Sequence, residues 1–138
     1  MNKALENRII QIPDNIVAIR NETRRILDGI LRWTGEKDFM QLRLLLPRLM
    51  NLISKIDAQS KEIDECISTL EGEKNADLTR DLLLQQKALL SNERSIIEKI
   101  RDDVSLSSRL IEKSEQMRLT GEILERCKAL ELSVKELR

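Results

Sequence analysis

Apolar residues recur along this chain at alternating steps of three and four, the spacing that places side chains on one face of an α-helix. The first such series is Ile16, Ile19, Thr23, Ile26, Ile30 and Trp33. Asp14 is suited to cap the start of this helix, and the Thr34-Gly35 pair is suited to end it. The pattern predicts a helix over about 14–34.

A second and longer series follows Asp38, another residue suited to a helix cap. Its members are Phe39, Leu42, Leu46, Leu49, Ile53, Ile56, Ser60, Ile63, Ile67 and Leu70. Pro47 lies inside the series, but the three-and-four phase is the same on both of its sides. We therefore predict one helix over about 38–70, kinked at Pro47 rather than interrupted by a loop.

The polar stretch 71–77 contains Gly72 and predicts a linker. Paired apolar residues then predict a third helix over about 77–118. A bend is predicted at 102–108, where acidic residues and serines interrupt the apolar stripe. Gly121 predicts a break before a last helix over about 121–138. The sequence thus predicts an all-α fold, an antiparallel bundle of three long helices plus a C-terminal helix joined by short loops.

Residues 1–13 are predicted to form a helical arm outside the bundle domain 14–138, because Pro13 lacks a backbone donor and disfavours a helical residue before it. This apolar arm either folds back on the bundle or docks against a partner helix. Leu27 and Leu31 widen the face of the helix that follows, so it is expected to touch more than one neighbour. The candidate partner contacts are Leu5, Ile9, Ile10, Ile12, Leu27 and Leu31.

Two leucine triplets, Leu44–Leu46 and Leu82–Leu84, cover most of a helix circumference. One seam cannot bury all three side chains of a triplet. The triplets either contact two neighbours inside the bundle or contribute to a surface that binds a partner.

The amino-acid composition limits the fold classes that the chain can adopt. Of the 138 residues, 41% are hydrophobic and 35% are charged, whereas 1% are aromatic, and only four are glycine and two proline. Sandwiches and barrels, which need frequent turns and aromatic or β-branched strands, are therefore excluded. No run approaches the roughly 18 apolar residues of a membrane-spanning helix, and the first residues lack the apolar run of a secretory signal.

The composition also limits the kinds of function that the chain can have. The chain contains no histidine, which excludes histidine-based catalysis and most zinc sites. Its 24 basic and 24 acidic residues leave no basic surplus for nucleic acid, and Cys66 and Cys127 lie too far apart in sequence for a CxxC motif. We therefore expect no enzyme, no cofactor, no metal, no small-molecule substrate and no nucleic-acid partner.

One stretch resembles a known family. The sequence DLLLQQ at 81–86, followed by ALLSNERS at 88–95, is similar to a leucine-rich stretch in the N-terminal part of the Sec-twenty family of endoplasmic-reticulum Q-SNAREs. The order of helices and glycine-containing turns over roughly 21–121 is also similar. These SNAREs act in vesicle transport from the Golgi back to the endoplasmic reticulum.

The resemblance implies a regulatory N-terminal domain that binds a subunit of a Dsl-type tethering complex on the cytosolic face of the endoplasmic reticulum. The SNARE helix and the membrane anchor would then lie in segments absent from this chain. Two alternatives remain open. One is the three-helix regulatory domain of a syntaxin, and the other is a cytoskeletal or chaperone bundle such as a spectrin-like repeat or a tubulin-binding cofactor.

Overall fold

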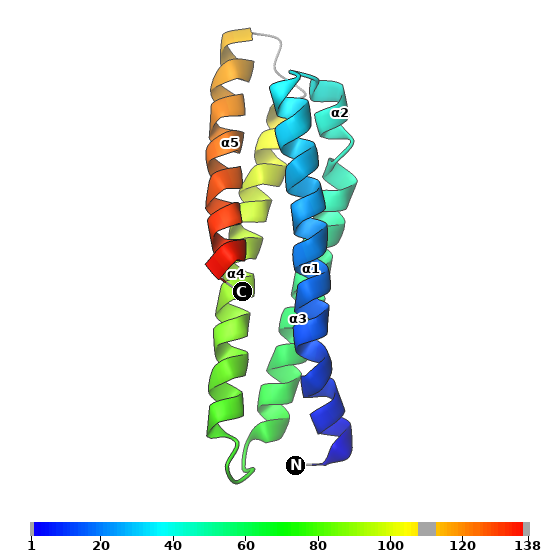
Figure 1. Ribbon diagram of the computed structural model, residues 1–138, viewed down its shortest axis with the longest axis vertical. Coiled ribbons are helices and arrows are strands. Elements are labelled where there is room, and N and C mark those ends of the chain that lie inside the picture. Colours follow the sequence, from blue (N-terminus) through cyan, green and yellow to red (C-terminus); the bar gives the residue numbers. More distant parts are fainter. Residues whose placement is uncertain (1, 108–112, 137–138) are drawn as a thin grey trace.

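The computed structural model describes residues 2–107 and 113–136, and within these ranges it contains helices and turns but no β-strand (Figure 1). The helices are α1 (Lys3–Gly35), α2 (Phe39–Arg43), α3 (Leu46–Leu70), α4 (Asp77–Ser107) and α5 (Lys113–Glu136). The predicted all-α class is confirmed.

The long helices run antiparallel to their neighbours along the chain (Figure 1). Helix α3 packs between α1 and α4, and α5 packs against both α4 and α1. Asn92 of α4 lies opposite Ser133 of α5, so the described part of α5 ends about half-way along α4 (Figure 1). The bundle therefore has a four-helix section and, toward the start of α1, a three-helix section made of α1, α3 and α4.

The apolar stripes predicted from the sequence meet in one core. Its completely buried side chains include Ile12, Ile26 and Ile30 of α1, Ile56 and Ile63 of α3, Ile97 and Ile100 of α4, and Ile123 of α5. The predicted linker is also present as a turn between α3 and α4, where Gly72 has φ +84° and Asn75 has φ 62°. Glycine and asparagine are the residues that adopt this left-handed conformation most readily.

The predicted break at Pro13 is wrong, because α1 continues through it. Pro13 is exposed, so water can hydrogen-bond to the carbonyl that the proline leaves without a donor. Leu5 and Ile12 are buried, and each such burial contributes about 1.5–3 kcal/mol against about 3 kcal/mol for the proline. Arg8 further ties this segment to Glu62 of α3, at 2.6 Å.

The predicted single helix over 38–70 is divided into α2 and α3 by Leu44 and Leu45. Pro47 is the second residue of α3, where the missing N–H is not needed, so the proline starts a helix instead of kinking one. Leu44 and Leu45 keep right-handed helical dihedrals, with φ −65° and −80°. This explains why the apolar phase is the same before and after the break.

The predicted boundary at Gly121 is also wrong, because Gly121 lies inside α5. Helix α4 ends at Ser107, within the segment 102–108 where a bend was predicted. Residues 108–112, and with them the last residue of that segment, lie outside the described ranges. Leu119 and Ile123 are both buried, on either side of Gly121, so packing carries the helix across the glycine.

Gly121→Ala should therefore stabilise the protein by about 0.5–1 kcal/mol, because alanine loses less backbone entropy than glycine in a helix. A Cβ at this position would meet no atom within 4 Å beyond the adjacent residues and the backbone of its own helix. Thermal unfolding followed by circular dichroism should show a higher midpoint. Gly72→Ala is the matched control and should lower the midpoint, because its φ is positive. A lower midpoint for Gly121→Ala would contradict a continuous α5.

Candidate interaction surface

The six residues predicted to contact a partner do not form one exposed surface. Three are buried in the chain's own core, namely Leu5, Ile12 and Leu27. Two are partly buried against that core, namely Ile9 and Leu31. Ile10 is 65% exposed. The three buried side chains are core residues, because α1 packs on the bundle along its whole length, and they are removed from the candidate surface.

In the four-helix section, α5 occupies one flank of α1 and one flank of α4. The α1–α5 contact is lined by Arg24, Leu27, Asp28, Glu131, Val134 and Lys135. On α4, the amide of Asn92 donates to the hydroxyl of Ser133 at 3.4 Å, and Asp103 accepts from Arg126. These contacts identify the sides of α1 and α4 that face α5.

The same two flanks continue into the three-helix section, where the described part of α5 does not cover them. On α1, Val17, Ile10 and Glu6 precede Arg24 by 7, 14 and 18 residues, and on α4, Leu82 and Leu78 precede Asn92 by 10 and 14 residues. At 3.6 residues per turn, each of them lies within about a quarter of a turn of the α5-facing residue on its helix. Glu6, Ile9 and Ile10 of α1 line a shallow cavity with Thr79 of α4. We define the α1/α4 groove by Glu6, Ile9, Ile10, Val17, Leu78, Thr79 and Leu82.

The α1/α4 groove is apolar and open to solvent. Val17 and Leu82 are about half exposed, and Ile10 and Leu78 are 65% and 72% exposed. Single exposed apolar residues are ordinary in soluble proteins, whereas several of them on the facing flanks of two helices are typical of an interaction site.

The leucine triplets are each divided between core and surface. Leu45 and Leu83 are buried, whereas Leu44, Leu82 and Leu84 are 66%, 52% and 47% exposed. In the sequence, the triplet at 82–84 was the feature that indicated a partner-binding surface on α4. The sequence did not indicate the other groove residues Val17, Leu78 and Thr79. A second exposed apolar cluster lies at the break between α2 and α3, where Leu44 lines a shallow cavity with Met40 and Pro47.

Glu93 was also missed by the sequence analysis. It is completely buried on α4, and neither of its carboxylate oxygens has a hydrogen-bond partner in the described part of the chain. Burial raises the pKa of Glu93 to about 7, against the lowering effect of the positive charge on Arg20. The sequence pattern could have indicated this burial, because Glu93 occupies a position of the apolar stripe between Leu90 and Ile97. Asn92 faces Ser133, so Glu93 lies where the two sections meet.

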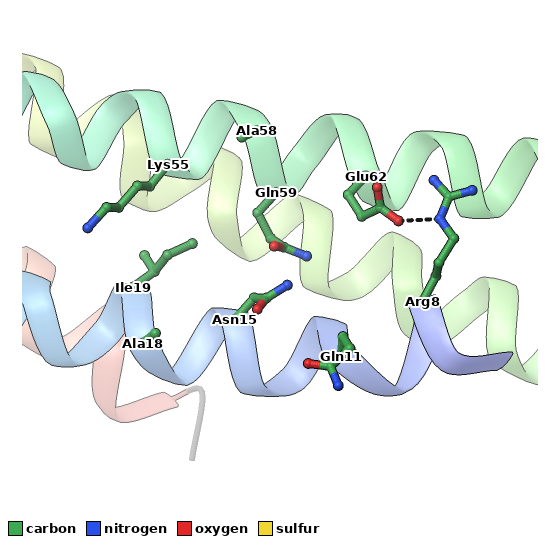
Figure 2. A pocket seen from close by; sticks show the side chains of 9 residues that line it. All are labelled: Arg8, Gln11, Asn15, Ala18, Ile19, Lys55, Ala58, Gln59 and Glu62. Carbon is green, nitrogen blue, oxygen red and sulfur yellow. Dashed lines mark hydrogen bonds and ion pairs between the residues drawn. The ribbon is translucent and has the colours of Figure 1, made fainter. Parts of the chain in front are cut away.

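A polar groove lies between α1 and α3 (Figure 2). Asn15 and Gln59 face each other across it, and Arg8 donates to Glu62 at its end (Figure 2). The hydrogen bond from Arg8 lowers the pKa of Glu62. Acid and base neutralise each other there, and small side chains such as Ala58 line the rest. This groove is therefore less suited than the α1/α4 groove to bind an apolar helix face.

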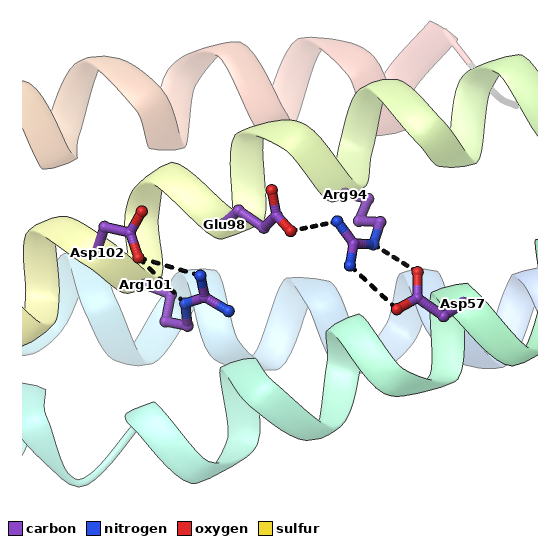
Figure 3. A network of polar contacts seen from close by, with 5 residues as sticks. All are labelled: Asp57, Arg94, Glu98, Arg101 and Asp102. Atoms are coloured by element: carbon purple, nitrogen blue, oxygen red, sulfur yellow. Dashed lines mark hydrogen bonds and ion pairs between the residues drawn. The ribbon is translucent and has the colours of Figure 1, made fainter.

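Ion pairs join α3 to α4 on the side away from α5 (Figure 3). Arg94 of α4 donates to both carboxylate oxygens of Asp57 on α3, at 2.5 and 3.1 Å, and also to Glu98. Arg101 pairs with Asp102 on the same helix at 3.1 Å. These contacts fix the register of α3 against α4.

No group of three or more cysteine, aspartate or glutamate side chains in the described ranges is placed to hold a metal ion, and no described helix has the length and apolar character needed to cross a membrane. Cys66 and Cys127 are both buried and unpaired, and burial raises the pKa of Cys127 to about 12.

Comparison with known proteins does not assign a family. The chain matches no protein-family model, no curated protein and no solved structure.

Proposed function

We propose that this chain is a non-enzymatic helical interaction domain whose α1/α4 groove takes an amphipathic helix from a partner protein. The observation that carries the proposal is the continuation of the α5-facing flanks into an uncovered apolar groove. A helix laid there would complete the three-helix section in the way that α5 completes the four-helix section. Recognition would follow the helix-in-groove mode, in which apolar side chains spaced by three and four insert between two helices.

The exposed side chains are large enough to support such binding. Burying a leucine or isoleucine side chain contributes about 1.5–3 kcal/mol. Ile10, Val17, Leu78 and Leu82 are each more than half exposed. Part of the gain is lost in ordering the partner and in the entropy of association, so binding of moderate strength is expected.

We further propose that the domain belongs to a membrane-trafficking SNARE and that the partner is a subunit of a Dsl-type tethering complex. The support is the resemblance of 81–86 and 88–95 to the Sec-twenty family, and Leu82 belongs both to that stretch and to the groove. The domain would act on the cytosolic face of the endoplasmic reticulum in transport from the Golgi. Segments outside this chain would join it to the membrane.

A syntaxin-type regulatory domain is the second candidate. The observation that favours it is a three-helix section with one flank free, because syntaxin regulatory domains fold back on their own SNARE helix. In that case the groove would take a helix of the same protein rather than one of a tether subunit.

Leu82→Asp should abolish capture of the purified tether subunit, because a charge in the middle of the groove cannot be buried against an apolar helix without a large desolvation cost. Leu84→Asp is the matched control, since Leu84 lies two residues away and is similarly exposed, 47% against 52%. Capture would be measured on immobilised domain, and thermal melting would confirm that both variants fold. Equal capture by wild type and both variants would contradict the proposal.

A further inference from the structure

We infer that the α1/α4 groove selects a helix that runs in the direction of α5 and carries basic residues in its last turn. This inference rests on the proposed function and specifies its ligand. Three features support it, namely the direction of the two groove helices, the charges along the groove, and the length left uncovered.

The two helices that form the groove run in the same direction. Helices α1 and α4 begin at Lys3 and Asp77, and both of these ends lie at the far end of the groove from α5 (Figure 1). The start of a helix carries a partial positive charge and its end a partial negative charge. A ligand helix that runs in the direction of α5 places its negative end beside two positive ends, whereas the reverse orientation brings like ends together.

The charges at this end of the groove are acidic. Glu6 lines the cavity with Ile9 and Ile10, whereas Lys3 in the same turn does not line it. Asp81 is exposed next to Leu82, and neither Glu6 nor Asp81 has an ion pair within the described part of the chain. Both carboxylates are therefore available to lysine or arginine side chains in the last turn of a ligand helix.

Three nearby cations are directed away from the groove, whereas Lys3 is exposed in the same turn as Glu6. The three bind as follows: Arg8 to Glu62 and Glu65 of α3, Lys87 to Asp64 of α3, and Arg80 to Asp77 and to the carbonyl oxygen of Leu70. Their charge is balanced along the α3 side of the section. A twofold dimer with its axis along the bundle would place Glu6 and Asp81 of one copy beside the same residues of the other, which disfavours this arrangement of two copies.

The uncovered length sets the size of the ligand. From Asn92, which faces α5, to Asp77 at the start of α4 is about 15 residues, or about 22 Å of helix. The two residues that follow Glu136 in the sequence span at most about 7 Å. The occupant is therefore a helix of about four turns from outside these 138 residues.

Two synthetic helical peptides of equal composition test the inference. Each is about 16 residues long, the length that fills the groove, with leucines spaced by three and four and with blocked termini. One carries three lysines in its last turn, and the other carries them in its first turn. With the full chain, fluorescence anisotropy should give a dissociation constant about tenfold lower for the first peptide. The double variant Glu6→Gln, Asp81→Asn should remove most of this preference.

Equal binding of the two peptides, or tighter binding of the second, would overturn the inference. Concentration-dependent dimers of the chain that Leu82→Asp dissolves would also overturn it, because the occupant would then be a second copy. Failure of the inference and failure of the proposed function are distinguishable. If Leu82→Asp blocks capture of the tether subunit while the two peptides bind equally, only the inference is wrong. If Leu82→Asp captures the tether subunit as well as wild type does, the proposed function itself is wrong.

Discussion

Ile12→Asp should unfold the bundle. The side chain of Ile12 is completely buried on α1, next to Pro13, so the substitution places a carboxylate in the core without a partner. The cost of burying such a charge is several kcal/mol, comparable to the roughly 5–15 kcal/mol that stabilises a whole domain. Circular dichroism should show loss of the cooperative thermal transition, or a midpoint lowered by more than about 15 °C.

Ile10→Asp is the matched control for this experiment. Ile10 lies two residues away in the same helix and is 65% exposed, so the variant should melt within a few degrees of wild type. If Ile12→Asp melts like Ile10→Asp, residues 3–13 are not packed on the bundle. The arm outside the bundle that the sequence alone predicts would then be correct after all.

The pH dependence of stability should report on Glu93. Its pKa is about 7 in the folded protein and 4.5 in the reference state, so the folded protein holds the proton more tightly than the unfolded chain does. Stability should therefore be greatest near and below pH 4.5, as far as this group is concerned, and fall as pH rises through about 7. A shift of this size corresponds to about 3 kcal/mol.

Glu93→Gln should remove this component, because the amide has a similar shape and does not ionise. Urea unfolding at pH 5 and pH 8 should show similar stability for the variant and wild type at pH 5, and a more stable variant at pH 8. Glu125→Gln, which removes an exposed carboxylate on α5, separates the effect of burial from the loss of a negative charge. A Glu93→Gln variant that is less stable than wild type at pH 8 would show that the buried carboxylate is held by a partner.

The sequence predicts the class and most of the core because both depend on periodicity. Ile26, Ile56 and Ile97 occupy stripe positions, and all three are at most 1% exposed. Helix ends were predicted less well, because they were placed at proline and glycine residues without knowledge of the packing around them. Pro13 and Gly121 both lie within helices, since buried residues on either side hold the backbone in place. Pro47 does mark an interruption of the predicted helix, but it lies at the start of α3 and not at a kink inside one helix.

The groove could not be predicted from the sequence in the same way. Leu82 and Leu83 look alike in a periodic pattern, yet Leu83 is 3% exposed and Leu82 is 52% exposed. Their difference depends on where α5 ends relative to α4, which is a property of the register between the two helices. Ile9 and Ile10 were identified as candidates by their apolar character, whereas Thr79 becomes apparent only from the cavity that it lines with them.

The isoleucine methyl NMR spectrum, recorded with and without the purified tether subunit, tests the central claim most directly. The chain has 16 isoleucines distributed over all the long helices, so the spectrum locates a binding surface in one measurement. We predict that the signals of Ile9 and Ile10 shift on binding, while those of Ile63 on α3 and Ile123 on α5 stay in place. Shifts confined to α3 or α5, with Ile9 and Ile10 unchanged, would contradict the α1/α4 groove as the site of interaction.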